Sequence, residues 1–139
     1  MEIIKRILPI MAIILCVTVG TVSAQKSYTH NGTTTTKAIG KEEIHHNQQL
    51  KVNENGTTLK VSLDGFEAFG NSGIGISGVL VKDANNNIIE YKDLKVTGIK
   101  GVKINSITGT LSSKKADIVL VGKLAGMFNF KIYYKATRQ

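Results

Sequence analysis

The chain has 139 residues, a formal net charge of +8, one cysteine, one proline and no tryptophan. A chain of this length forms one domain with a hydrophobic core of its own. Its charge favours acidic partners such as anionic lipid, polysaccharide or nucleic acid, although no basic run exceeds Lys114-Lys115 and scattered lysines also serve simply to keep a protein in solution.

The first segment of the chain has the parts of a secretory signal peptide. Lys5 and Arg6 form a short basic start, an apolar run follows, and Val-Ser-Ala at 22–24 places small residues where a signal peptidase reads them. Such a leader is removed from the mature protein. We therefore predict a signal peptide over residues 1–24, export to the periplasm or out of the cell, and a single mature domain over residues 25–139.

Two alternatives fit this leader less well. A membrane anchor needs about 20 consecutive apolar residues, and the run here is shorter and is broken by Thr18 and Thr21. Lipoprotein processing cuts before a cysteine preceded by small residues, whereas Cys16 follows Ile, Ile and Leu at 13–15. Without the leader the chain has no cysteine, no proline, 16 basic and 9 acidic residues, and a net charge of +7, so packing alone must hold the domain together.

The mature chain begins with polar residues and continues in strand patterns. Residues 33–39 are rich in threonine, whose β-branched side chain favours a pleated sheet, and residues 40–49 are the one stretch that would accommodate a helical turn. Residues 50–63 contain two alternating runs around Asn55-Gly56. That dipeptide predicts a hairpin with a type I′ turn, because both central residues of this turn have positive φ.

Five further strands follow at short intervals, at 74–82, 88–99, 102–112, 117–124 and 128–136. The last alternates most strictly, with Phe128, Phe130, Ile132 and Tyr134 on one face. Such alternation indicates a strand with one dry and one wet face.

About eight strands joined by short turns, with no convincing helix between them, predict an all-β domain. Consecutive antiparallel strands form a meander, and a meander of this size hides its edges by closing on itself. We expect an eight-stranded antiparallel up-and-down barrel, with a β-sandwich as the alternative.

The strand rhythm of residues 33–136, and Ile-x-Gly-x-Leu at 107–111 followed by an apolar strand, resemble the calycin-like β-barrel proteins secreted by gut-type bacteria. The resemblance implies a lipocalin-type barrel with an interior pocket. It supplies no catalytic residues.

One glycine motif suggests a different fold. The sequence GIGISG at 73–78 has the G-x-G-x-x-G spacing of a dinucleotide-binding loop. That loop needs a helix directly after the glycines and an acidic residue ~20 positions on, whereas a strand and a turn follow here and Glu90 lies twelve residues past Gly78. We expect Gly73, Gly75 and Gly78 to let a strand bend or to allow a close approach.

Metal binding and catalysis find little support. His45 and His46 are adjacent, and adjacent residues of a strand point to opposite faces; in a helix, Glu42 would lie one turn before His46. No serine lies in a G-x-S-x-G elbow, and the acidic residues lie mostly at predicted turns, where they bond to the backbone. We expect no metal, no cofactor and no enzymatic activity.

Two kinds of partner are also disfavoured. Nucleic-acid binding needs basic residues interleaved with exposed aromatics, and the mature chain has eight aromatic residues. A membrane barrel carries apolar bands toward the lipid, whereas Lys60, Lys95, Lys103 and Lys131 fall mid-strand, opposite the apolar faces. We expect no nucleic acid and no membrane-spanning mature domain.

Two functions remain for such an exported barrel. The first is a binding protein with a small apolar ligand inside, because eight strands enclose either side chains alone or one small ligand. The residues we expect to contact it are Phe128, Phe130 and Tyr134 inside the barrel, with Phe66 and Phe69 near a rim, although plain core packing explains these aromatics as well. The second is an interaction or inhibitor module whose basic outer surface binds an acidic component of the cell envelope.

Overall fold

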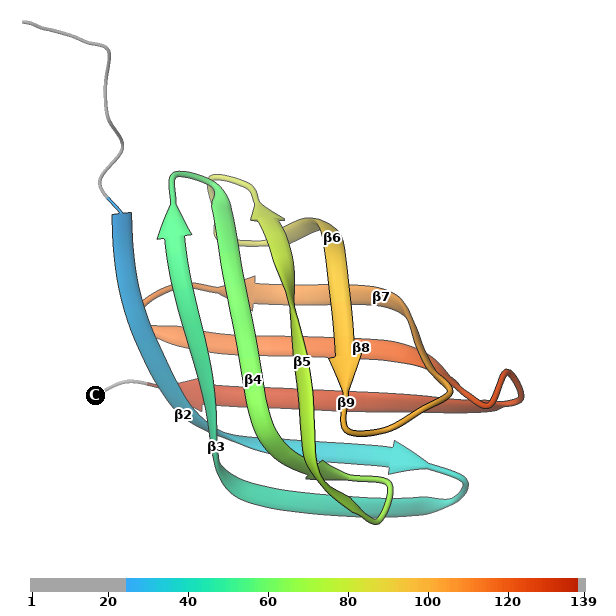
Figure 1. Ribbon diagram of the computed structural model, residues 1–139. Helices are drawn as coiled ribbons and strands as arrows, with labels where there is room; N and C mark the ends of the chain where they lie inside the picture. Colours follow the sequence, from blue (N-terminus) through green and yellow to red (C-terminus); the bar gives the residue numbers. More distant parts are fainter. Residues whose placement is uncertain (1–24, 138–139) are drawn as a thin grey trace, which may run out of the picture.

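The computed structural model describes residues 25–137, and every regular element in that range is a β-strand (Figure 1). The expected signal peptide lies outside the described residues. In chain order the strands are β2 (Gln25–Ala38), β3 (Lys41–Asn55), β4 (Thr58–Ala68), β5 (Asn71–Lys82), β6 (Ile88–Thr97), β7 (Val102–Leu111), β8 (Lys115–Leu124) and β9 (Phe128–Thr137).

The strands form one antiparallel sheet in the order β6-β5-β4-β3-β2-β9-β8-β7. The first strand closes the sheet onto the last, because β2 pairs with β9 from Thr33 opposite Lys135 to Ala38 opposite Phe130. The one break in the circle lies between β6 and β7, and we call it the seam. The predicted eight-stranded up-and-down barrel is therefore confirmed, as a nearly closed barrel.

The barrel has two halves that cross. Figure 1 shows β7, β8 and β9 running across the direction of β4, β5 and β6, with β2 and β3 bent between the two groups. The bend falls where the register of β2 and β3 shifts between Gly32 and Thr34, and Asn47 on β3 there has a positive φ of 58°, as a bulge residue often does. Glycine is needed at position 32, because a Cβ would lie 2.5 Å from the Lys135 carbonyl oxygen.

The seam is held by side chains and a short stretch of backbone. The Leu111 amide donates to the Asn86 carbonyl at 3.0 Å. Further along, the Tyr91 hydroxyl donates to the Asn105 carbonyl at 2.8 Å. These contacts join β7 to β6 and to the turn before it where the continuous ladder is interrupted.

The stretch at 40–49 that would accommodate a helical turn belongs to a strand. β3 begins at Lys41, and its first half pairs with the threonine-rich end of β2, with Thr34 opposite His45. β2 also begins earlier than predicted, at Gln25. Pairing between neighbours thus decided the structure of two polar segments that lack apolar alternation.

The hairpin predicted at Asn55-Gly56 is present, but its turn differs from the expected one. Asn55 lies opposite Thr58, so the loop is Gly56-Thr57. Gly56 has a φ of +64° and is the loop residue with positive φ, which is the pattern of a type II′ turn and not of type I′.

The GIGISG sequence lies within β5, and a turn and β6 follow it. A Cβ on Gly75 would lie 2.7 Å from Thr97 Oγ1, and one on Gly78 would lie 2.6 Å from Leu94 Cδ2. Side chains of β6 therefore need the space that these glycines leave. The expectation of a close approach along a strand is confirmed.

The two ends of the barrel differ in chemistry. At one end, which we call the apolar end, the turns contain the apolar residues Ile39, Phe69, Ile99, Ala125 and Met127. At the other end, the polar end, the loops at 56–57, 83–87 and 112–114 consist of Gly, Thr, Asp, Asn, Ser and Lys residues with one Ala. The turns of the apolar end gather at the lower right of Figure 1.

Candidate functional site

The interior of the barrel is filled by its own side chains. Buried apolar residues of all eight strands form one core. The space left between them measures about 40 Å³, whereas pockets for small molecules measure ~300–1,000 Å³. Its lining is apolar except for one tyrosine hydroxyl and includes Leu50, Leu63, Ile76, Ile107, Ile118 and Tyr134. The centre of the barrel is therefore a packed core.

The five aromatic residues expected at a ligand site have different environments. Phe66, Phe130 and Tyr134 are buried in the core. Phe69 is half-buried in a turn of the apolar end, where its ring meets that of Phe130 edge to face with centroids 5.1 Å apart. Phe128 is 41% exposed, so it is not part of the buried core. It is the first residue of β9, at the apolar end of the barrel.

A second space opens at the apolar end, and we call it the mouth pocket. It measures about 340 Å³ and is lined by the apolar Ala38, Ile39, Phe69 and Leu124 and by the polar Thr36, Lys41 and Glu43. Thr36 is 2% exposed, and its Oγ1 has no hydrogen-bond partner. The mouth pocket thus combines apolar walls with one buried hydroxyl that is free to bond.

Beside the mouth pocket, side chains bridge a gap in the sheet. β3 and β4 pair from Leu50 opposite Leu63 toward the polar end, so their other halves are joined by side chains. His45 lies between two carboxylates, with Nε2 3.2 Å from Glu43 Oε1 and Nδ1 3.1 Å from Glu67 Oε1. The cluster ties β3 to β4 with an ion-pair geometry.

The two adjacent histidines do not converge on one point. His46 is exposed, and its Nδ1 lies 3.0 Å from Thr33 Oγ1, away from the His45 cluster. Within residues 25–137, no group of three or more His, Cys, Asp or Glu side chains is placed to hold a metal ion.

The polar end is closed by a buried ion pair. Lys82 is 7% exposed, and its Nζ lies 3.2 Å from Glu54 Oε1, 2.8 Å from Asn86 Oδ1 and 3.4 Å from the Leu111 carbonyl. The Tyr28 hydroxyl donates to the same Glu54 oxygen at 2.9 Å. Because an ammonium group has three donors, Lys82 is saturated by these partners, and the cluster joins strands on both sides of the seam.

Four exposed lysines form two directly opposed pairs on the outside of the barrel, and we call them the basic face. Lys103 on β7 lies opposite Lys123 on β8, and Lys37 on β2 lies opposite Lys131 on β9. Like charges directly opposite each other destabilise a sheet. Glu42 offsets part of this charge, with its carboxylate 3.8 Å from Lys37 Nζ. The basic face is therefore an arrangement that stability alone disfavours.

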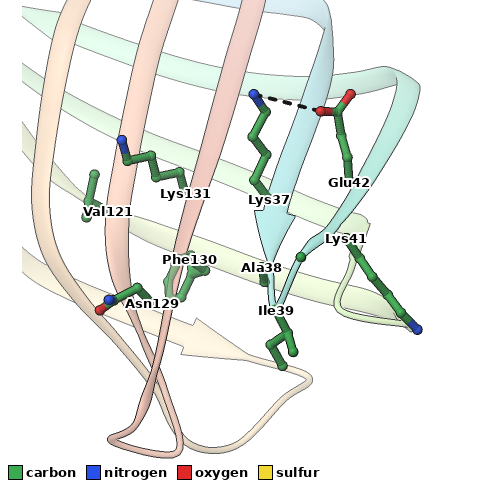
Figure 2. A pocket seen from close by; sticks show the side chains of 10 residues that line it. Lys37, Ala38, Ile39, Lys41, Glu42, Val121, Asn129, Phe130 and Lys131 are labelled. Carbon is green, nitrogen blue, oxygen red and sulfur yellow. Dashed lines mark ion pairs between the residues drawn. The ribbon is translucent and has the colours of Figure 1, made fainter.

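The two lysine pairs are neighbours, and a groove runs beside them. Lys123 lies opposite Asn129, and Lys131 is the next residue of β9 on that side because side chains alternate. The groove measures about 600 Å³ and is lined by residues of β2 and β9, the turn after β2, the start of β3 and one residue of β8. Of the basic face, Lys37 and Lys131 line it. In Figure 2, Lys37 and Lys131 project from neighbouring strands, whereas Lys41 points away from both.

Sequence reasoning missed the basic face because its lysines come from four strands and form no run along the chain. The sequence shows only that each of these lysines occupies an outward position in the alternating pattern of its strand. Which outward positions meet depends on strand register, and a single sequence does not show the register.

Comparisons with protein-family models, with curated proteins and with solved structures give no match for this chain. Its class therefore rests on the fold, a nearly closed barrel of eight antiparallel strands in meander order, which is compatible with a calycin-like architecture. Among the described residues, no helix has the length and apolar character to cross a membrane.

Proposed function

We propose that this protein is an exported, non-enzymatic binding protein of the calycin-like type, and that its basic face recognises an anionic partner. The observation that carries the proposal is the direct opposition of Lys103 with Lys123 and of Lys37 with Lys131. A bound anion would attract both lysines of a pair and so offset the repulsion between them. The groove beside the lysines offers a concave surface for such a partner.

A matched pair of variants tests this proposal. One replaces Lys37, Lys103, Lys123 and Lys131 with glutamine. The control replaces four exposed lysines of the other half of the barrel, Lys51, Lys60, Lys92 and Lys95, and so removes the same net charge. The readout is the salt concentration that elutes each protein from immobilised heparin, used as a polyanion that contains no lipid.

We expect the basic-face variant to elute at much lower salt than the control. Exposed ion pairs contribute about 0.2–1 kcal/mol each, so the loss of four, about 0.8–4 kcal/mol in total, weakens binding by roughly fourfold to a thousandfold. Salt screens such contacts strongly. Equal losses in both variants would mean that the lysines act only through net charge, and the proposal would then fail.

The mouth pocket favours a second function, the retention of a small apolar ligand. Its volume of about 340 Å³ lies within the range of ~300–1,000 Å³ for ligand pockets, and the Thr36 hydroxyl is buried without a partner. A ligand with an apolar body and one polar group would satisfy it. Native mass spectrometry of protein purified from its own host should show a released small molecule, with lower occupancy in Thr36→Val. A bare protein mass would rule the ligand out.

A further inference from the structure

Three of the large apolar side chains that are exposed in the described chain lie together at the apolar end. They are Ile39, which is 62% exposed, Met127, which is 71% exposed, and Phe128, which is 41% exposed. We call them the tips. They belong to the β2–β3 and β8–β9 hairpins, and both hairpins project at the lower right of Figure 1.

The two hairpins are neighbours in space. β2 and β9 remain paired up to Ala38 opposite Phe130, and the turn residue Ile39 lines the same groove as Asn129. The β2–β3 and β8–β9 turns are therefore adjacent at one edge of the barrel. The three tips belong to these two adjacent turns.

The backbone conformation at position 39 does not favour isoleucine. Its φ is +52° and that of Gly40 is +69°, so the turn has positive φ at both central positions. Asn-Gly suits such a turn, whereas a β-branched residue with positive φ is strained. An exposed isoleucine at this position is unfavourable both for the backbone and for solvation, which points to a role in contact with something apolar.

Lysines lie close to the tips along the chain. Lys37 precedes Ile39 by two residues and Lys41 follows it by two, while Lys123 and Lys131 flank the β8–β9 turn on either side. All four are exposed. Apolar tips with lysines set behind them match the layering of a bilayer surface, where anionic headgroups lie above the acyl chains.

Two other occupants fit less well. A second copy of this chain would bring identical lysines against one another. A folded protein partner usually covers about 800 Å² on each side, whereas the tips are a few side chains on narrow turns. A shallow insertion between lipid headgroups needs only such a small projection.

We infer that the apolar end docks onto the surface of an anionic lipid bilayer, with Ile39, Met127 and Phe128 inserted between the headgroups and the lysines bound to their phosphates. This inference rests on the proposed function, since the bilayer is its anionic partner.

Vesicle binding tests the inference and separates its failure from that of the proposed function. The test uses residues 25–139, which include every strand of the barrel, because the apolar leader would itself insert into lipid. Vesicles of phosphatidylcholine alone are compared with vesicles that also contain phosphatidylglycerol. The tip variant is Ile39→Asn, Met127→Ser and Phe128→Ser. Its control replaces exposed isoleucines elsewhere, Ile44→Asn and Ile89→Ser.

We expect the unaltered protein and the control to sediment with phosphatidylglycerol vesicles only. The tip variant should bind these vesicles at least tenfold more weakly while it still elutes from heparin at the salt of the unaltered protein. Vesicle binding by the tip variant equal to that of the control would overturn the docking inference and leave the anion-binding proposal standing. If the basic-face variant still bound both vesicles and heparin as the unaltered protein does, the docking inference and the anion-binding proposal would both be overturned.

Two further measurements guard against a misfolded variant. Ile39→Asn alone should raise the melting temperature, because asparagine adopts positive φ more readily, and it should still weaken vesicle binding. A single tryptophan introduced as Met127→Trp should shift its fluorescence to the blue on anionic vesicles. An unshifted spectrum on vesicles that bind the protein would contradict insertion.

Discussion

At the scale of single residues, Tyr134 shows how one side chain connects three strands. It is 2% exposed, and its hydroxyl lies 2.8 Å from the Gln48 carbonyl and 3.2 Å from the His30 carbonyl. β9 is thereby joined to β3 and β2 beside the bend at Gly32. An aromatic that the sequence placed among ligand contacts thus serves as a structural link.

The ionisation of Tyr134 should limit stability in alkali. Burial raises the pKa of Tyr134 to about 12, while an unfolded chain has a tyrosine pKa of about 10. The protonated hydroxyl therefore favours the fold fully below about pH 10, and this contribution is lost as the pH rises through about 12. We expect the free energy of unfolding to fall by about 2–3 kcal/mol from this group over that interval.

Urea unfolding of Tyr134→Phe checks this expectation. The variant should be about 1 kcal/mol less stable at neutral pH, because it loses a buried hydrogen bond, and its stability should fall less steeply in alkali. Tyr133→Phe, at a half-buried neighbouring position, serves as the control. Parallel alkaline losses in the unaltered protein and Tyr134→Phe would contradict the assignment.

Phe128 marks the limit of residue-level reasoning about burial. Its alternation with Phe130 and Tyr134 places it on the inward face of β9. It is nevertheless exposed, although Leu124 of β8 lies opposite it, because β9 begins there and its pairing with β2 ends at Phe130. Alternation shows the face of a strand, but distance from the strand end decides whether that face is covered.

At the scale of elements, local pattern predicted most strands and failed in two polar segments, the start of β2 and the first half of β3. The first half of β3 has Glu43 and His45 at the positions that face inward, so its sequence shows no apolar alternation. The His45 ring contacts the Glu43 carboxylate of its own strand and the Glu67 carboxylate of β4. Because that partner lies on another strand, the segment alone does not identify itself as a strand.

Turns follow the same rule. The polar Asn55-Gly56 signal correctly predicted a hairpin, whereas Ile39-Gly40 forms a hairpin turn without the usual asparagine. In that turn the glycine supplies one left-handed residue and the isoleucine is forced into the other. The dipeptide is visible in the sequence, but its apolar residue reads as part of a strand until the pairing on both sides is known.

At the scale of the whole molecule, closure depends on contacts across the seam. Lys82 of β5 reaches the Leu111 carbonyl of β7, and it holds Glu54 of β3 on its other side. The Lys82 ammonium group thus links strands on both sides of the seam.

Removal of this group should destabilise the barrel. Lys82→Met leaves the Glu54 carboxylate buried without its cation, which costs about 3 kcal/mol by comparison with broken buried ion pairs. The exposed Lys60→Met should change the free energy of unfolding by only about 0.5 kcal/mol. Chemical denaturation of both variants provides the measurement. A cost for Lys82→Met no greater than that for Lys60→Met would show that the seam closes without this pair.

The sequence alone determined the all-β class, the rhythm of the strands and the role of GIGISG, because these depend on side-chain alternation and glycine spacing within short segments. Tertiary structure decided that the interior is filled, that Lys37 meets Lys131, and that the apolar tips lie together. Each of these depends on the register between strands that are distant in the chain and on how their side chains pack together. Neither the register nor the packing can be deduced from one segment alone.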